Sequence, residues 1–161
     1  MGNIVFNIAK GEVNAYSKRV KNNDPANSAL VLVLLKTSEA DGPLQDYDTL
    51  GDILAAGGGT ANVEANFTNY ARKVITDATM LPTVVDDAGN QQYSDVPDQT
   101  YVSAGGAVNN ALSRLLVCYD SDTTSGTDAN IIPLVALDFV ITTSGADIAA
   151  IFSAQGFFGA S

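Results

Sequence analysis

The residues best suited to chemistry are three acids on one short stretch, Asp120, Asp122 and Asp128. Closely spaced carboxylate oxygens are ligands that calcium prefers in proteins. The EF-hand pattern, however, requires glycine at its sixth position and glutamate at its twelfth, and counting from Asp120 these positions hold Ser125 and Ile131. We therefore expect an exposed loop without a metal, and a weak calcium site formed by the three acids is the alternative.

The chain contains no histidine and one cysteine, Cys118. Without histidine, the Ser-His-Asp and Cys-His catalytic arrangements are excluded, and the usual zinc ligand sets lose their commonest member. Cys118 lies between Val117 and Tyr119 in an apolar run, which favours a buried, inert thiol over a nucleophile. We therefore expect no cofactor and predict that the protein is not an enzyme.

Two further patterns have ordinary structural interpretations. Asp46, Asp48 and Asp52 could form paired carboxylates, but they share one face of a predicted helix, and such faces are usually solvated. Residues 57–59 are glycines that suggest a phosphate-binding loop, but the lysine and hydroxyl residue of the Walker pattern do not follow them. We interpret the glycines as a flexible helix end. A glycan hydrolase with two carboxylates in a cleft remains the enzymatic alternative.

Two apolar runs flank the acidic loop and organise the chain. Residues 115–119 and 131–139 are each long enough for a strand, which predicts strand, exposed loop and strand. A third apolar run, residues 29–35, shows no alternation. A strand of this kind has both faces covered, so we expect it in the middle of a sheet.

The remaining elements are shorter. Apolar residues recur at helical spacing in residues 10–21, and a second helix is predicted over residues 44–56. Residues 2–9 alternate loosely, which fits a short strand or an arm that lies on a neighbouring subunit. The other strand candidates are residues 67–75, a hairpin over 83–93 with its turn at 87–90, residues 99–103, and a final pair formed by 147–153 and 156–161. Together these elements predict a single α+β domain over residues 1–161, with a mostly antiparallel β-sheet, two short helices and the alternative of an N-terminal arm at residues 1–9.

Charge and composition narrow the classes of partner. The chain has 18 acidic and 8 basic residues, for a net charge of -10, so nucleic acid and anionic membranes would repel it. Charged residues make up 16%, below the typical share of about 25%, which suits a surface covered by other subunits or a polar monomer. The longest apolar run is far shorter than the roughly 20 residues that span a bilayer. The first residues lack the features of a signal peptide, so we expect synthesis and folding in the cytoplasm.

Several motifs resemble those of a known family. They are Asn66–Lys73, Val96–Gly106, Asn109–Asn110, Leu115–Asp120, Gly126–Asp128, Ile132–Leu134, Asp138–Phe139 and Gly156–Phe158, with Phe6–Gly11 near the N-terminus. In these motifs the chain resembles a family of small virion structural proteins encoded by tailed bacteriophages. The resemblance extends over most of the chain.

The resemblance implies a component of the phage particle, located on the outer capsid surface as a cement or decoration protein. Its partner would be the major capsid protein of the same phage, and it would be a homo-oligomer, with a trimer favoured. A protein that binds the assembled lattice and not the free subunit stabilises the shell by mass action. The alternatives are a neck, tail or head-fibre component and, from a different class, a sugar- or host-binding module with exposed aromatic residues on a loop.

For a cement protein the functional site is an interface. The candidates are Ile4, Phe6 and Ile8 at the N-terminus, and Phe157 and Phe158 at the C-terminus. Adjacent residues point opposite ways in a strand, so one of the two phenylalanines is expected to face the core and the other a partner. Ordinary core packing is the alternative for each candidate.

Overall fold

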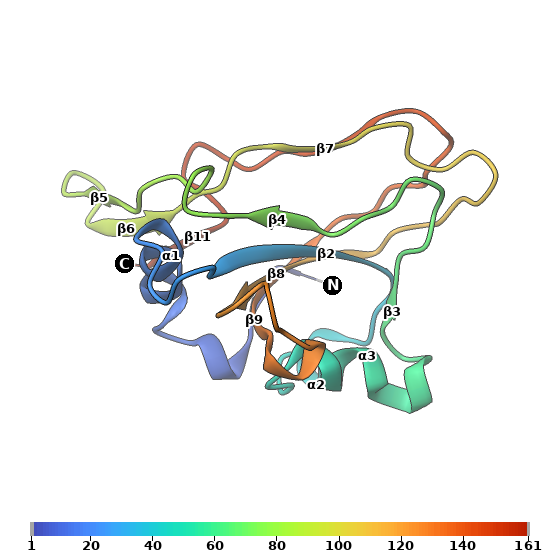
Figure 1. Cartoon of the computed structure of the whole chain (residues 1–161), viewed down its shortest axis with the longest axis horizontal. Coiled ribbons are helices and arrows are strands. Elements are labelled where there is room, and N and C mark those ends of the chain that lie inside the picture. Colours follow the sequence, from blue (N-terminus) through green and yellow to red (C-terminus); the bar gives the residue numbers. More distant parts are fainter. Residues whose placement is uncertain (1, 161) are drawn as a thin grey trace.

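A computed structural model describes residues 2–160, and its centre is strand β2 (Ala29–Thr37), whose first seven residues are all buried (Figure 1). This strand belongs to a six-stranded antiparallel sheet with the order β1-β9-β8-β2-β3, in which β4 also pairs with β2. The other strands of this sheet are β1 (Ile4–Val5), β3 (Val63–Glu64), β4 (Lys73–Ile75), β8 (Arg114–Asp120) and β9 (Ile132–Asp138). The predicted central strand is therefore confirmed.

The two apolar runs around the acidic loop form β8 and β9, as predicted. All seven residues of β8 are buried, and they pair with β2 from Ala29↔Asp120 to Leu35↔Arg114. On its other side β8 pairs with β9, with a register shift between Val117 and Cys118. Figure 1 shows α2 (Asp41–Leu44) and α3 (Leu50–Gly59) on one side of β2, and the ribbon of β7 (Gln99–Tyr101) on the other. Both faces of the central strands are thus covered, which explains their unbroken apolar sequence.

Two smaller sheets complete the β-structure. The predicted hairpin is confirmed as β5 (Val84–Asp86) and β6 (Gln91–Ser94), and β11 (Phe158–Ala160) adds to its other edge. The predicted pairing of residues 147–153 with 156–161 is wrong. Strand β10 (Ile148–Ala150) pairs with β7, and only one bridge, Ser153↔Gly156, joins the two terminal segments. The backbone of Gly156 has φ of +75°, and this turn directs the last strand along β6.

The first predicted helix is confirmed as α1 (Val13–Lys21), which starts three residues later than expected because a 3₁₀ turn occupies residues 7–9. The second predicted helix, residues 44–56, is confirmed from Leu50 onward as α3, and α2 is an additional helix that ends where the predicted one begins. Thr49 has an extended backbone, and its Oγ1 accepts a hydrogen bond from the Asp52 N–H at 3.0 Å, so a new helix begins there. The right-handed conformation ends before Gly57 and Gly58, whose φ values are +57° and +67°, so the glycines end the helix as predicted.

The α+β class with a mostly antiparallel sheet is confirmed, with three short α-helices in the described residues instead of two. The predicted strand over residues 67–75 is reduced to β4, because the chain turns at Asn69, where the Tyr70 N–H donates to the Phe67 carbonyl at 3.0 Å. No helix within residues 2–160 is long and apolar enough to cross a membrane. Met1 and Ser161, the outermost residues of the predicted arm and last strand, lie outside the described residues.

Candidate interaction surface

The N-terminal candidates lie on the domain itself. Strand β1 pairs with β9, and the Phe6 N–H donates to the Leu134 carbonyl at 3.0 Å. Phe6 is fully buried in the core and Ile4 is half-buried against it, whereas Ile8 is 42% exposed. Within residues 2–9 the chain therefore lies on its own domain, as the short strand β1 followed by the 3₁₀ turn. The expectation for Phe6 is corrected, because a side chain buried in its own chain has no surface left for a partner.

A buried arginine holds this N-terminal segment in place. The Arg114 guanidinium, which is fully buried, contacts the Gly2 carbonyl and the Asp41 carboxylate, and its Nη1 lies 3.1 Å from Asp138 Oδ1. The Gly2 N–H donates to Asp41 Oδ2 at 2.9 Å. This N–H, together with the guanidinium, lowers the pKa of Asp41 below its usual value. The sequence alone did not reveal this role, because a lone arginine at the start of an apolar run has no distinctive pattern.

The C-terminal candidates divide as the strand geometry predicted. Phe157 is buried, and its N–H donates to the Ser94 carbonyl at 3.0 Å. Its ring contacts Phe152 edge-on, with the centroids 6.5 Å apart. Phe158 is half-buried in β11. Phe157 is therefore a core residue and is removed from the interface candidates, while Phe158 keeps some exposed surface.

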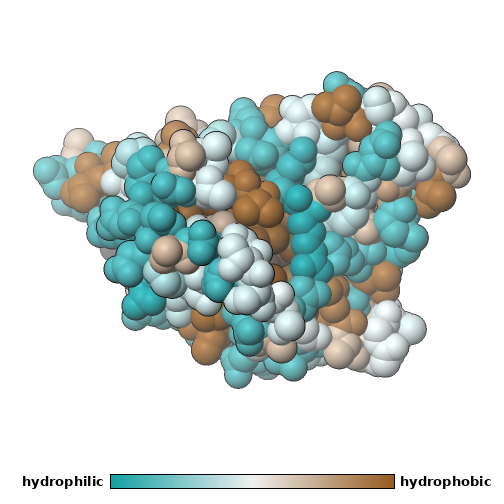
Figure 2. Space-filling model, viewed as in Figure 1, coloured by the Kyte–Doolittle hydropathy of each residue, from teal (hydrophilic) through white to brown (hydrophobic). Residues whose placement is uncertain are grey.

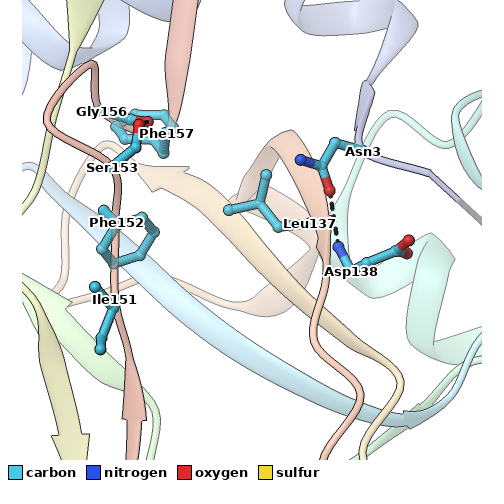
Figure 3. A pocket seen from close by; sticks show the side chains of 8 residues that line it. All are labelled: Asn3, Leu137, Asp138, Ile151, Phe152, Ser153, Gly156 and Phe157. Atoms are coloured by element: carbon cyan, nitrogen blue, oxygen red, sulfur yellow. Dashed lines mark hydrogen bonds between the residues drawn. The ribbon is translucent and has the colours of Figure 1, made fainter.

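A pocket of about 230 Å³ separates the end of β9 from the C-terminal segment (Figure 3). On one side the Asn3 Oδ1 accepts a hydrogen bond from the Asp138 N–H at 3.0 Å. The residues that line it are Asn3, Leu137, Asp138, Ile151, Phe152, Ser153, Gly156 and Phe157. Ile151 is 76% exposed and stands beside the opening. Sequence reasoning missed this pocket because its two walls, the end of β9 and residues 151–157, are separated in the sequence by a loop and by β10.

The three acids proposed for calcium do not converge. Asp120 Oδ1 accepts the Asp122 N–H at 3.0 Å, whereas Asp122 accepts the hydroxyls of Thr124 and Ser125, both at 2.6 Å. These hydroxyls lower the pKa of Asp122. Asp128 turns away to pair with an arginine. Across residues 2–160 no three acidic, histidine or cysteine side chains lie close enough to hold a metal ion. The structure thus assigns Asp120 and Asp122 to hydrogen bonds within their own loop and Asp128 to an ion pair with Arg72.

Arg72 fixes the acidic loop to the sheet. Its Nη1 lies 2.6 Å from Asp128 Oδ1, and its Nη2 lies 2.7 Å from Glu64 Oε2 and 3.0 Å from Asp128 Oδ2. The Arg72 Nε–H also donates to Glu64 Oε1 at 2.8 Å, so one guanidinium engages both carboxylates. The hydrogen bonds from Arg72 lower the pKa of Asp128. The Tyr70 hydroxyl, which donates to Glu64 at 2.9 Å, extends the network to β2 by accepting the Leu34 N–H at 3.1 Å.

One of the acidic regions of the molecule is built around α2, α3 and β3. Residues 37–71, which include α2, α3 and β3, contain six acidic residues and no lysine or arginine. The acidic loop joins them, because the Leu50 N–H donates to the Ile131 carbonyl at 2.9 Å and Gly51 lies against Ala129. In Figure 1 these segments lie together below β2. We call this region the acidic end.

A second region carries almost no charge. Residues 102–113 have no charged side chain, and residues 139–161 have only Asp147. The two segments run side by side: the Ala104 N–H donates to the Ala146 carbonyl at 3.0 Å, and the Leu112 N–H donates to the Ile141 carbonyl at 2.7 Å. The loops within residues 104–112 and 141–146 lie at the opposite end of the molecule from the β5–β6 hairpin (Figure 1), whereas β11 pairs with β6. Hydrophobic residues reach the surface at both ends (Figure 2). We call residues 102–113 and 139–160 the neutral region.

Comparison of the chain with models of protein families, with curated proteins and with solved structures finds no match. The resemblance to phage virion proteins therefore depends on the sequence motifs alone. The geometry adds the arrangement of the surface: an acidic end, a neutral region and a pocket between β9 and the C-terminal segment.

Proposed function

We propose that the protein is a structural component of a tailed-phage virion, and specifically a cement protein that binds the assembled capsid lattice. The motif resemblance supports the choice of family. The observation that carries the proposal is the division of the surface. Four acids of the acidic end form no ion pair within the described residues, and the neutral region lies apart from them; the four are Glu39, Asp46, Asp48 and Asp52. Such a surface suits binding between other proteins, with different faces for different neighbours.

The acids that face one another in the structure share a cation. Glu64 and Asp128 are joined by Arg72, and Asp41 and Asp138 both lie on Arg114. Each of these carboxylates already contacts an arginine of its own fold, which leaves it less free to exchange a proton with a substrate. These groups therefore maintain the fold, and the function we propose is exerted by the outer surface without turnover of a substrate.

The acidic end is the face that we assign to the shell. A chain with a net charge of -10 associates fastest with a positively charged surface, and its exposed carboxylates raise that rate most at low salt. The protein stabilises the shell to the extent that it binds the lattice better than the free subunit. Occupancy of capsids should therefore fall as salt rises, and bound protein should raise the temperature at which capsids break down.

A test adds purified protein to capsids that lack it and measures the bound copies by sedimentation and cryo-EM. We expect saturation at hundreds of copies, no binding to free capsid subunits, and weaker binding by the charge-reversal variant Asp48→Lys at the acidic end. Asp87→Lys is the matched control, because Asp87 is also exposed but lies in the turn of the β5–β6 hairpin. Equal loss of binding in both variants would show that total charge and not the acidic end determines occupancy.

Copy number in purified virions separates the cement role from its alternative. If virions contain a dozen copies or fewer, a neck, tail or head-fibre role replaces the cement role. If virions lack the protein, both roles are rejected. The trimeric state that the resemblance implies stays a prediction.

A further inference from the structure

The outer face of helix α1 is basic, although the chain as a whole is acidic. Residues 10–21 contain four of the eight basic residues of the chain and one acid. The helix buries one face against the domain, and the opposite face presents Ala15, Lys18, Arg19 and Asn22, which recur at helical spacing and are all exposed. We call these four residues the basic stripe.

The two cations of the basic stripe have no acidic partner within residues 2–160. All four ion pairs in this part of the chain belong to Arg72 or Arg114. Lys18 Nζ donates to a neutral group, the Gln92 Oε1, at 3.5 Å. Two exposed acids, Glu12 and Asp24, precede and follow the helix but form no ion pair with it. The fold itself therefore makes no use of the charge on this face.

The acidic end of the same chain carries the complementary charge. Asp48 and Asp52 flank the start of α3, both are exposed, and neither forms an ion pair within the described residues. Helix α1 lies beside the β5–β6 hairpin, to which the Asn14 Nδ2 donates at the Gln92 carbonyl at 3.2 Å, whereas α3 lies below β2 (Figure 1). Within one copy the two surfaces do not meet, so they can pair only between copies.

The charge of the whole chain decides which anionic partner suits the basic stripe. Nucleic acid presents a continuous row of phosphates, which a net charge of -10 repels. The acidic end of a second copy instead offers a few separate carboxylates. The remaining charge of that copy can point into solvent, where salt screens it beyond about 8 Å at physiological ionic strength.

We propose that the basic stripe of one copy docks on the acidic end of a second copy, with Lys18 and Arg19 against Asp48 and Asp52. The contact joins two different surfaces, so it is heterologous and builds rings or chains. A helix of nine residues is about 14 Å long, so its face is far smaller than the roughly 800 Å² of a stable interface, and the contact is weak. Because the shell is proposed to bind the same acidic end, self-association belongs to the free protein and is released on the shell.

The test measures self-association of the free protein by sedimentation velocity. Arg19→Glu and its control Lys36→Glu change the net charge equally, but Lys36 lies at the β3 end of β2 and not on α1. A difference between the two variants therefore reports the basic stripe and not the overall repulsion. We expect the dissociation constant of Arg19→Glu to exceed that of Lys36→Glu at least about fivefold at about 0.02 M salt, and the difference to vanish at about 0.5 M.

Two further variants test the other half of the contact. Asp48→Lys makes the net charge less negative, which by itself favours association of two anionic copies. We expect weaker association, because the docking carboxylate is replaced by a cation. The double variant Arg19→Glu/Asp48→Lys exchanges the two charges and keeps the wild-type net charge, so association should recover. Both positions are exposed, and circular dichroism checks that each variant folds.

The opposite results would overturn the proposal. Wild-type protein that stays monomeric up to about 500 µM at low salt would reject self-association through any face. Equal association of Arg19→Glu and Lys36→Glu, tighter association of Asp48→Lys, or no recovery in the double variant would reject this contact. Binding of a short DNA duplex that Arg19→Glu abolishes would assign the basic stripe to nucleic acid instead.

This test uses no capsid, so its failure and the failure of the cement role are distinguishable. Arg19→Glu leaves the acidic end intact and should keep full occupancy of capsids, whereas Asp48→Lys should lower both self-association and occupancy. Self-association without capsid binding would reject the cement role alone. Capsid binding without self-association would reject this contact alone.

Discussion

Replacement of Arg72 by methionine tests whether the arginine network holds the acidic loop on the sheet. Methionine keeps an unbranched apolar stem but removes all four hydrogen bonds to Glu64 and Asp128. The two carboxylates then face each other without the intervening cation. We expect loss of stability with little change in the rest of the fold.

The size of the effect follows from the exposure of the groups. The side chains of Arg72, Glu64 and Asp128 are 26%, 23% and 38% exposed. A fully exposed ion pair contributes about 0.2–1 kcal/mol, and a hydrogen bond to a charged group in a drier site about 1.5–3 kcal/mol. At this intermediate exposure we take about 1 kcal/mol for each carboxylate, so the substitution should cost about 2 kcal/mol. For a chain of this size, that lowers Tm by about 4–8 °C.

The effect should depend on pH with a definite sign. Hydrogen bonds from Arg72 lower the pKa of Asp128 in the folded state. Its contribution is therefore full above the unfolded pKa of about 3.9 and is lost as the pH falls through the lower, folded value. The stability difference between wild type and Arg72→Met should be constant near pH 7 and should shrink below about pH 4.

Urea denaturation at several pH values, followed by circular dichroism, measures this difference directly. Arg72→Lys is the control, because a lysine ammonium keeps the charge but does not form paired hydrogen bonds with two carboxylates at once; it should recover about half of the loss. Equal stability of Arg72→Met and wild type at pH 7 would refute the reasoning. So would a difference that persists unchanged at pH 2.5.

Three further predictions concern the backbone, the thiol and the acidic loop. Gly156→Ala should lower the free energy of unfolding by more than about 2 kcal/mol in urea denaturation, because Gly156 has a positive φ and a Cβ there would overlap the Ser94 carbonyl. Gly58→Ala is the control: Gly58 also has a positive φ but has open space around it, so this change should cost only about 1–2 kcal/mol. Burial raises the pKa of the Cys118 thiol, so the folded protein should not react with a thiol reagent at pH 8. The thiol should react fully in denaturant, and rapid labelling of the native protein would contradict this prediction. Added calcium should leave Tm where a chelator leaves it, because Asp122 already accepts hydroxyl groups of its own loop; a rise that grows with calcium concentration would restore the metal site.

Sequence patterns predicted the centre of the fold well. Residues 29–35 and the two apolar runs at 115–119 and 131–139 became β2, β8 and β9, because long apolar runs have few other ways to leave water. The hairpin over 83–93 was also correct, since its turn chemistry is local. The partners of residues 147–153 and 156–161 were wrong, because pairing of short strands far apart in the sequence depends on contacts that no local pattern encodes.

The candidate site was less predictable for a related reason. Phe6 and Phe157 looked like interface residues because apolar residues near chain ends suggested arms, but both found room in the core. The roles of Arg72 and Arg114 could not be predicted, since each connects segments more than 50 residues apart in the sequence. The neutral region, in contrast, was visible in the sequence as 23 residues with one charged side chain, and only its position around a pocket required the structure.

Binding through the acidic end gains from the net charge of -10, so occupancy of capsids should fall as salt rises. The screening length falls from about 30 Å at 0.01 M salt to about 3 Å at 1 M, so most of the loss should occur within this range. Occupancy that does not change with salt would show that the acidic end does not face the shell.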